Sequence, residues 1–267
     1  MLDGNISVVM PILDEAKALP RFLSDLSSTI ASHPELAINE LVFVDDGSRD
    51  GTLEFVERFA RQATRCSTKV LVREGRRGPA SAEVDGFKAA SNAHVVKMDA
   101  DGQHPPSALP SLVGAIGDNV DVVVASRYVE GGGATWPPLR GIISLTARHL
   151  TWLLVPPTRC VRDPVSGFFF ARRNLVSGLD SEVPHYKLLA YLLASNPRTR
   201  VREIPFVMGN REEGQSKIVG TSFDYVANFF DEILRYRQIY SGKGTGSGES
   251  HGSREIAVPS HDTLGAR

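Results

Sequence analysis

The feature that most restricts the fold is a short apolar run, rich in valine and isoleucine, that recurs in the first half of the sequence. Continuous apolar runs of this length are typical of strands in a parallel sheet with both faces buried. Helix-like segments separate them, so the alternation predicts a doubly wound, mostly parallel α/β sheet. The predicted strands are 6–11, 40–46, 69–72, 94–99 and 121–126.

The helix-like segments begin after residues that suit helix starts. The first begins near Glu15, and the second follows Ser48 and Asp50, both of which suit a helix N-cap. Beyond Tyr128 the alternation stops, and a Gly- and Pro-rich stretch at 129–141 predicts a loop. Helices are expected at 15–31, 51–63, 79–92, 106–117 and 223–240, and further strands at 166–172 and 200–207.

Length and composition predict one folded domain followed by a tail. The chain has 267 residues, of which 42% are hydrophobic and 23% are charged, which is enough for one large core. We expect this domain at residues 1–240. From Ser241 the sequence becomes rich in Gly and Ser, so residues 241–267 are predicted to form a disordered tail.

Charge, cysteine content and hydropathy argue against several classes of protein. A formal net charge of −1 does not suit a nucleic-acid-binding protein, so a phosphate site would have to be local. Cys66 and Cys160 form no zinc or disulfide pattern, which suits a reducing compartment. The start of the chain does not resemble a signal peptide, and no window reaches the roughly 18 apolar residues of a membrane span. We expect a soluble protein, or one that touches a membrane from one side.

Acids, small turn residues and arginines follow the ends of the predicted strands. Ligands of doubly wound sheets bind beyond the carboxyl ends of the strands, so this edge is the expected site. Asp99 and Asp101 leave the fourth strand one residue apart, which directs both carboxylates to one side if the chain stays extended. Mg²⁺ or Mn²⁺ would relieve their repulsion and leave positions for substrate phosphates. The same spacing also fits an ordinary turn.

Other polar residues at this edge extend the hypothesis. Asp45 and Asp46 either belong to the start of the next helix or accept hydrogen bonds from a nucleobase or ribose. The sequence has no Gly-rich phosphate loop, so a nucleotide would be held by acids, a metal and distant basic residues. Arginine suits bidentate phosphate binding and lysine supplies a point charge. The basic candidates are Arg127, Arg140, Arg211 and Lys217.

A set of motifs in fixed order resembles the family 2 glycosyltransferases, which have the GT-A fold. Within that family the chain is similar to the polyprenyl-phosphate sugar transferases, of the dolichol-phosphate mannose synthase type. The resemblance covers roughly residues 5–240. The motifs are PILDEA, VDDGSRDGT, GPASAEVDGFKAA, MDADGQHPP, SRYVEGG with a later Trp, Arg and Ser, DPVSGFF, and REEGQSK.

The resemblance implies roles for individual residues. It implies that the donor nucleotide is bound by Pro11, Glu15, Asp45, Asp46, Asp99, Ala100 and Gln103. It implies that the divalent metal, Mg²⁺ or Mn²⁺, is held by Asp99, Asp101 and Gln103. It implies that the acceptor phosphate is bound by Arg127, Arg140 and Ser144. The residues implied in catalysis are Asp101, Arg127, Arg140, Arg211 and Lys217, and those near the sugar are Asp163, Ser166 and Gly167.

The implied reaction is an inverting, metal-dependent transfer of a hexose, mannose from GDP-mannose, onto a polyprenyl or dolichyl phosphate. A phosphate monoester has a second pKa of about 6, so the attacking oxygen is already ionised and needs no general base. His104 is therefore expected to be structural. Leu13 and Asp14 replace an aromatic residue and an amide of the family, which keeps a UDP-sugar donor such as UDP-glucose as an alternative.

Two other expectations concern class and location. A receiver-type signalling domain also places acids at strand ends, but its acid pair follows the first strand and not the second. Many relatives carry C-terminal membrane helices that this sequence lacks. Contact with the cytoplasmic face of a membrane would therefore depend on the amphipathic segments 142–155 and 223–240, or on a membrane-anchoring partner.

Overall fold

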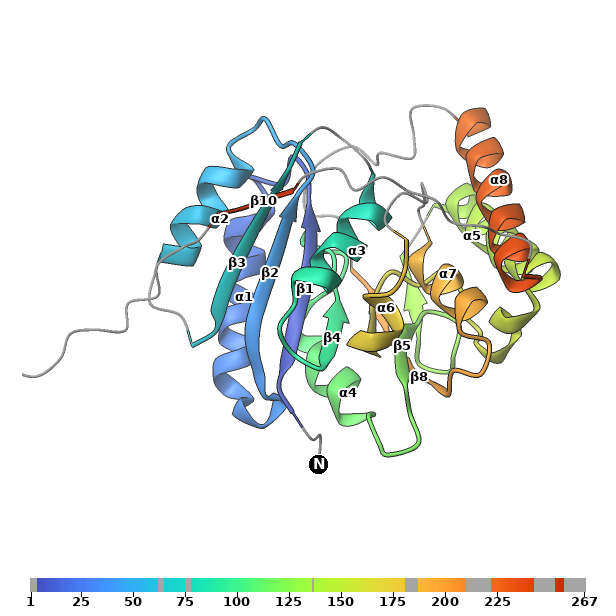
Figure 1. The fold of residues 1–267 in the computed structure, drawn as a ribbon, viewed down its shortest axis with the longest axis horizontal. Helices are drawn as coiled ribbons and strands as arrows, with labels where there is room; N and C mark the ends of the chain where they lie inside the picture. Colours follow the sequence, from blue (N-terminus) through green and yellow to red (C-terminus); the bar gives the residue numbers. More distant parts are fainter. Residues whose placement is uncertain are drawn as a thin grey trace, which may run out of the picture.

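A central sheet organises the chain in this computed structural model, which describes residues 4–61, 65–74, 78–135, 137–180, 187–209, 222–242 and 253–256. Within these residues the sheet has eight strands in the order β10-β3-β2-β1-β4-β7-β5-β8 (Figure 1). The strands are β1 (Ile6–Ile12), β2 (Ile38–Asp45), β3 (Ser67–Arg73), β4 (His94–Lys97), β5 (Val122–Ser126), β7 (Phe169–Arg172), β8 (Val201–Pro205) and β10 (Ser253–Ile256). A small second sheet pairs β6 (Gly133–Ala134) with β9 (Val207–Met208).

The sheet is mostly parallel, as the sequence predicts. β3, β2, β1 and β4 run parallel to one another, and β5 runs parallel to β8. β7 lies between β4 and β5 and is antiparallel to both, and β10 is antiparallel to β3. The five predicted Val-rich strands are all confirmed. β4 ends at Lys97, before Asp99, because the Asp99 N–H turns out of the ladder and donates to His104.

Helices cover both faces of the sheet, which gives two hydrophobic cores. The first face carries α1 (Leu19–Ser32), α2 (Thr52–Arg61) and α4 (Leu109–Gly114). The second carries α3 (Pro79–Ala89), α5 (Pro138–Leu154), α6 (Arg173–Val176), α7 (Leu188–Ser195) and α8 (Ser222–Tyr240). Short 3₁₀ turns lie at η1 (Pro34–Leu36), η2 (Pro106–Ala108) and η3 (Pro156–Cys160).

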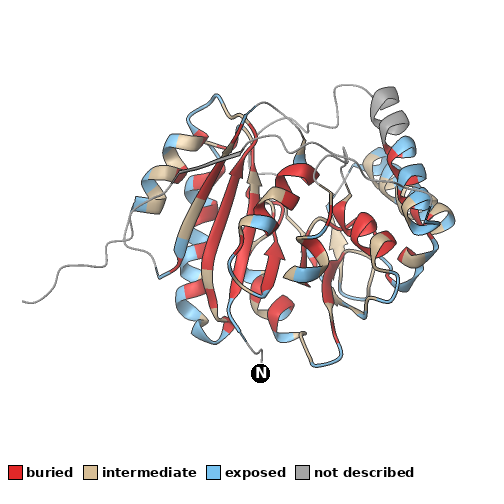
Figure 2. Ribbon diagram, viewed as in Figure 1, coloured by how far each residue is buried: buried red, intermediate tan, exposed pale blue. Residues whose placement is uncertain are grey.

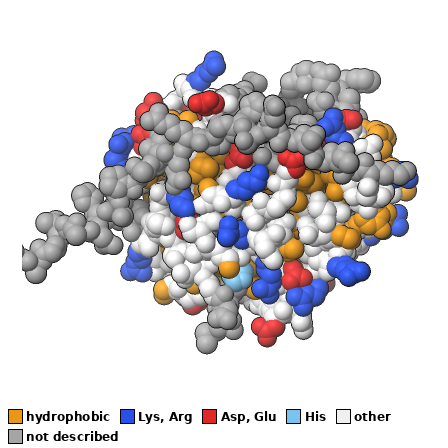
Figure 3. Space-filling view, in the orientation of Figure 1, with side chains coloured by type: hydrophobic (Ala, Val, Ile, Leu, Met, Phe, Trp, Pro, Cys, Tyr) orange, Lys and Arg blue, Asp and Glu red, His pale blue; other side chains and the backbone are white. Residues whose placement is uncertain are grey.

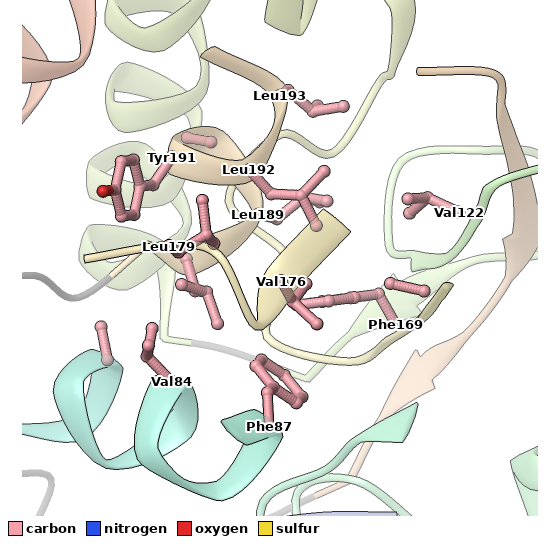
Figure 4. Close-up of a cluster of buried hydrophobic side chains, with 14 of the residues drawn as sticks. Val84, Phe87, Val122, Phe169, Val176, Leu179, Leu189, Tyr191, Leu192 and Leu193 are labelled. Atoms are coloured by element: carbon pink, nitrogen blue, oxygen red, sulfur yellow. The ribbon is translucent and has the colours of Figure 1, made fainter. Parts of the chain in front are cut away.

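Alternating side chains of one strand enter opposite cores, as the period of two requires. In β1, Val9 faces the α3 side while Val8 and Met10 face the α1 side. Both faces of the central strands are therefore buried, which explains their continuous apolar sequences (Figure 2). Figure 4 shows the α3-side core, where side chains of α3, α6, α7 and β7 meet.

Several predicted boundaries differ from the structure. The first helix begins at Leu19 and not near Glu15, because the N–H groups of Glu15 and Ala16 bond to the β2–α2 loop instead. The predicted loop at 129–141 contains β6, and its last residues start α5 at Pro138, where proline suits a first helical turn. Within the predicted tail, Ser253–Ile256 forms β10, so disorder does not hold for those four residues.

The described helices include none that is both long and apolar enough to cross a membrane.

Candidate active site

The carboxyl ends of β1, β2, β4 and β5 bring the candidate residues to one edge of the sheet. These strands point the same way, so the loops that follow them meet at that edge. β7 runs in the opposite direction, so the residues before it reach this edge. The edge therefore combines the segments after β1, β2, β4 and β5 with residues 163–168.

The loops after β1 and β2 are joined by hydrogen bonds. The Asp14 N–H donates to Ser48 Oγ at 3.0 Å, and the Ala16 N–H donates to Asp50 Oδ2 at 3.0 Å. The buried Glu15 donates its N–H to Thr52 Oγ1 at 2.7 Å. These contacts hold Glu15 and the end of the strand that contains Pro11 beside the second loop, where a nucleotide is predicted to bind.

Asp45 and Asp46 are both buried, and both carboxylates shape their own surroundings. Asp45 accepts the N–H groups of Gly47 and Ser48 at 3.2 Å. Asp46 pairs with the Arg73 guanidinium at 2.6 Å and accepts the Gly78 N–H at 3.0 Å. Arg73 is itself buried, so this pair fixes the approach to α3. Both acids therefore bond within the segments before α2 and α3, and α2 itself starts later, at Thr52. Nucleotide binding by the two acids stays a prediction.

The Asp99–Gln103 loop leaves β4 above a buried lysine. The side-chain amine of Lys97 lies 2.6 Å from Asp99 Oδ1 and 3.1 Å from Glu83 Oε1 on α3. Asp101 is buried and accepts the Gln103 N–H at 3.0 Å. The loop therefore has the form of a turn, with both carboxylates held at the carboxyl edge.

The single positive charge of Lys97 faces the two carboxylates of Asp99 and Glu83, and this shifts the pKa of all three groups. Burial acts to raise the pKa of Asp99, but the charge and hydrogen bond of Lys97, together with other nearby groups, bring that pKa to about 2. Burial would lower the pKa of Lys97, yet Asp99 and Glu83 raise it above its usual value. Burial raises the pKa of Glu83 to about 7 despite Lys97. Asp99 is thus the ionised partner of Lys97 at neutral pH.

His104 is a structural residue here, as expected from the sequence. Its Nδ1 accepts the Asp99 N–H at 2.8 Å, so this nitrogen carries no proton. The ring stacks on Phe168 with centroids 5.0 Å apart and meets the edge of Phe206. Burial lowers the pKa of His104 to about 4. The neutral ring supports the turn after β4 and is not placed to act as a base.

The segment before β7 connects the acidic loop to the end of β5. Asp163 forms a two-point ion pair with Arg127, in which Nε and Nη2 each lie 2.7 Å from a carboxylate oxygen. Ser166 Oγ donates to the Ala125 carbonyl at 2.7 Å. A Cβ on Gly167 would lie 3.0 Å from Lys97 Nζ and 3.6 Å from Asp99 Oδ2, so this glycine permits the close approach.

The first turns of α5 carry the other predicted acceptor residues. Arg140 and Ser144 are four residues apart on this helix, so they lie on one face. Ser144 Oγ lies 2.8 Å from the hydroxyl of Tyr128, which follows β5. This contact links α5 to the strand end that bears Arg127.

Arg211 and Lys217 lie outside the described residues, so their predicted roles stay predictions. The described chain before them ends at Gly209, whose N–H donates to the Gln103 carbonyl at 3.0 Å. A Cβ on Gly209 would lie 2.7 Å from the Gly102 carbonyl oxygen, which explains glycine at this contact. The chain thus passes directly over the acidic loop two residues before Arg211.

Several residues of the site were missed by sequence reasoning. Lys97 had a usable signal, because a lysine within a strand buried on both faces requires a charged partner. Glu83 and Arg73 lacked such a signal, because their partners are distant in sequence. In addition, a charged residue on a helix, such as Glu83, is usually solvated. Tyr128 was named only as part of a strand end, and its hydroxyl contact depends on where α5 lies.

The donor set of the acidic loop fits a hard divalent cation. Among the described residues, no group of three or more His, Cys, Asp or Glu side chains converges as a metal site. The predicted set, the carboxylates of Asp99 and Asp101 with the amide of Gln103, therefore stays a prediction. Oxygen ligands of this kind suit Mg²⁺ or Mn²⁺, which complete their coordination with phosphate oxygens and water.

Comparison with known proteins agrees with the fold. The sequence model of glycosyl transferase family 2 matches residues 7–176. The dolichol-phosphate mannosyltransferase of Pyrococcus furiosus is 36% identical over 84% of this chain, which spans 62% of that protein. The protein of the same name from Mycosarcoma maydis is 37% identical over 86% of this chain and 79% of its own. That of Saccharomyces cerevisiae is 35% identical, over 80% and 81%.

Solved structures support the same fold at lower identity. Glucosyl-3-phosphoglycerate synthase from Mycobacterium tuberculosis, in complex with phosphoglyceric acid, aligns with a TM-score of 0.65 at 22% identity. The alignment covers 91% of this chain and 82% of that one. The fold and the matches define the class of protein, a glycosyltransferase with the GT-A fold. Within that class, the chain belongs to glycosyl transferase family 2.

Proposed function

We propose that the protein transfers mannose from GDP-mannose to the phosphate of a polyprenyl phosphate, such as dolichyl phosphate, with inversion at the sugar carbon. Three relatives above bear the name dolichol-phosphate mannosyltransferase. The geometry supports this proposal, because acids follow β2 and β4 on the proposed donor side, and the end of β5 and α5 make up the proposed acceptor side.

The observation that carries the proposal is that α5 bears both phosphate-binding side chains and exposed apolar side chains. Its first turns bear Arg140 and Ser144, which suit a phosphate. The same helix exposes Leu139, Ile142 and Leu153 by 70%, 60% and 67%. A hollow runs along it, lined by Ile142, Leu145, Thr146, His149, Leu150 and Leu153. A lipid phosphate has the matching design, an anionic head joined to a long apolar chain.

The nature of the acceptor removes the need for a general base. A polyprenyl phosphate arrives ionised, so its oxygen can attack the sugar carbon directly. His104, at the centre of the donor side, has its Nδ1 committed to the Asp99 N–H. Catalysis is then positioning and charge neutralisation, with Arg127, Arg140 and Ser144 on the attacking phosphate and Arg211 and Lys217 on the leaving diphosphate.

We propose that Asp99, Asp101 and Gln103 would hold a divalent metal, Mg²⁺ or Mn²⁺, which would supply positive charge to the diphosphate when bound. Structural neighbours of the same fold include a synthase in complex with Mn²⁺ and UDP, which supports a divalent cofactor. Lys97 keeps Asp99 ionised and oriented. Pro11, Glu15, Asp45, Asp46 and Ala100 form the proposed nucleotide side.

The location follows from the proposed acceptor. Apolar residues of α5 and α8 gather at one margin of the molecule (Figure 3). We propose that this margin rests on the cytoplasmic face of a membrane, alone or with a membrane-anchoring partner.

The proposal is tested by assaying the full chain with Mn²⁺, dolichyl phosphate and radiolabelled GDP-mannose or UDP-glucose. We expect a β-linked mannosyl lipid from GDP-mannose and little product from UDP-glucose. The reverse preference would support the alternative donor, which the UDP-glucose complexes of structural neighbours also suggest. Titration calorimetry with GDP and UDP, each with Mn²⁺, separates the two donors without turnover.

Asp101→Ala tests the metal assignment. We expect a loss of at least about 100-fold in turnover, because removing even an outer partner of a metal typically costs 10- to 100-fold. Mn²⁺ binding in the presence of GDP, measured by electron paramagnetic resonance, should weaken in parallel. Asp118→Ala removes an exposed acid elsewhere and serves as the control. Full activity of Asp101→Ala in the presence of chelator would contradict the assignment.

A further inference from the structure

Tyr128 and Arg148 lie between the two halves of the acceptor side. Tyr128 follows β5, one residue after Arg127, and Arg148 lies on α5, four residues after Ser144. The Arg148 guanidinium carbon is 4.5 Å from the centroid of the Tyr128 ring and 4.6 Å from that of Trp152. A cation held between two aromatic faces is attracted to both rings.

The charge of Arg148 is unusual because no carboxylate of the described residues pairs with it. Its Nε is buried and has no hydrogen-bond partner among the described residues. The second ring of the stack is itself fixed, since Trp152 Nε1 donates to the Val161 carbonyl at 2.9 Å. Arg148 is therefore held by ring faces, and its position determines where the Tyr128 ring can lie.

The Tyr128 hydroxyl is the partner of Ser144. A helical serine can donate to the carbonyl four residues earlier, as Thr151 does to Ala147 at 2.8 Å on this helix. The hydrogen bond of Ser144 in the described structure is instead to Tyr128, at 2.8 Å. Two hydroxyls at this distance share one proton position between them. If Ser144 donates its proton to a phosphate, Tyr128 must donate to Ser144.

We propose that Tyr128 and Arg148 are positioning residues for the acceptor phosphate. Tyr128 donates to Ser144 Oγ and so directs the Ser144 proton toward the phosphate. Arg148 holds the Tyr128 ring, and its charge over that ring makes the phenol a better donor. The guanidinium carbon of Arg127 lies 5.5 Å from the centroid of the same ring, so Tyr128 also aligns α5 with the end of β5. This inference rests on the proposed function.

The test is a double-mutant cycle between Tyr128→Phe and Ser144→Ala, assayed with GDP-mannose and dolichyl phosphate. We expect Tyr128→Phe to lower kcat/KM for the acceptor by about 2- to 10-fold, the usual effect of one hydrogen bond. The KM for GDP-mannose should not change. Because Tyr128 acts through Ser144, Tyr128→Phe should add no further loss to Ser144→Ala.

Arg148→Met gives a second, independent arm. We expect a similar loss for the acceptor, and no added loss when it is combined with Tyr128→Phe. Arg58→Met is the matched control, because Arg58 also stacks on one ring, that of Phe55 at 5.3 Å, on α2. The control should keep wild-type kinetics. Additive losses in the Arg148 cycle would show a separate phosphate contact and overturn its positioning role.

The outcomes separate this inference from the function on which it rests. A wild-type chain that makes no mannosyl lipid defeats the proposed function, and the inference falls with it. An active wild type in which Tyr128→Phe is silent, or is additive with Ser144→Ala, defeats the inference alone. An unchanged acceptor KM with a raised donor KM would place Tyr128 on the donor side and also overturn it.

Discussion

Three carboxylates at the active edge each have a cation within reach. Asp46 has Arg73, Asp163 has Arg127, and Asp99 has Lys97. The Asp46–Arg73 and Asp163–Arg127 pairs each join segments that are distant in the sequence, whereas Lys97 and Asp99 are two residues apart. Such pairs contribute little when compared with apolar replacements, but removing one partner is costly because the other stays buried.

Lys97→Met provides a test at this scale. The substitution removes the lysine amine and leaves Asp99 and Glu83 without their shared cation. We therefore expect a loss of roughly 3 kcal/mol in unfolding free energy. Urea denaturation of the full chain measures it. Adding Glu83→Gln should recover part of the loss.

A second lysine supplies the control for that measurement. Lys69→Met breaks a pair with Glu40 in which the lysine side chain is 26% exposed, compared with 5% for Lys97. We expect the Lys69 variant to lose less stability than the Lys97 variant. Equal losses would show that burial of the lysine is not the deciding factor.

Elements are brought into contact by small residues as much as by large ones. A Cβ on Gly86 would lie 2.4 Å from Val9 Cγ1 and 2.9 Å from Val44 Cγ2. The absence of a side chain therefore lets α3 pack directly on β1 and β2. Because α3 carries Glu83 and begins beside Gly78, this contact also sets the distance between the helix and the acidic loop.

Gly86→Ala should therefore destabilise the protein, although alanine is the better helix former. We expect a loss of about 1–3 kcal/mol, typical of overpacking in a core. Gly114→Ala on α4 is the matched control, since no atom lies within 4 Å of its Cβ position. The control should be neutral or slightly stabilising in the same thermal unfolding experiment. A stable Gly86→Ala would mean that α3 can shift without cost.

The strands β5, β7 and β8 are tied at one end by Asp121. Its carboxylate lies 2.8 Å from Nη2 of Arg200 and 3.3 Å from Nε of Arg172. Hydrogen bonds from Arg200 lower the pKa of Asp121 to about 2. The unfolded value is about 3.9, so the carboxylate favours the folded state above pH 4, and this contribution disappears as the pH falls toward 2.

The unfolding free energy of the wild type should therefore decrease more steeply between pH 4 and pH 2 than that of Asp121→Asn. Chemical denaturation at a series of pH values in this window measures both slopes. Parallel slopes for the two proteins would show that Asp121 titrates alike in the folded and unfolded chains.

At the scale of elements, sequence reasoning succeeded where one physical signal dominates. The Val-rich runs of β1, β2 and β5 allow only strands buried on both faces. The direction of β7 had no signal, because a central strand is apolar in either orientation. The Arg127–Asp163 pair was equally hidden, since both residues were assigned to separate motifs and only the reversed strand brings them together.

Exposed hydrophobic side chains are unevenly distributed over the whole molecule, which agrees with its proposed lipid acceptor. The large exposed hydrophobic side chains include five on α5, with others on α8 (Figure 3). The remaining helices on the opposite face of the sheet bury their apolar sides in the core. A molecule of this kind can rest one margin on a lipid surface while its donor side stays in water.

Ile142→Ser combined with Leu153→Ser tests this orientation. Burial of one such side chain is worth about 1.5–3 kcal/mol, so partition onto phosphatidylcholine vesicles with dolichyl phosphate should fall at least about 10-fold. Sedimentation of the vesicles measures bound protein. Val207→Ser on β9 removes an apolar side chain of equal exposure elsewhere and should leave binding unchanged. Equal losses in both variants would argue against a defined membrane face.

The ion pair between Arg127 and Asp163 has a consequence for how this enzyme could diversify. The chain leaves the sheet at Arg127, builds β6, α5 and η3, and returns at Asp163, where the two ends are fastened together. Residues 128–162 thus form an excursion whose two ends are fastened by this pair. An excursion from a relative with another acceptor could be grafted between the same two residues, and the recognition of the acceptor would change while the sheet and its donor loops remained as they are.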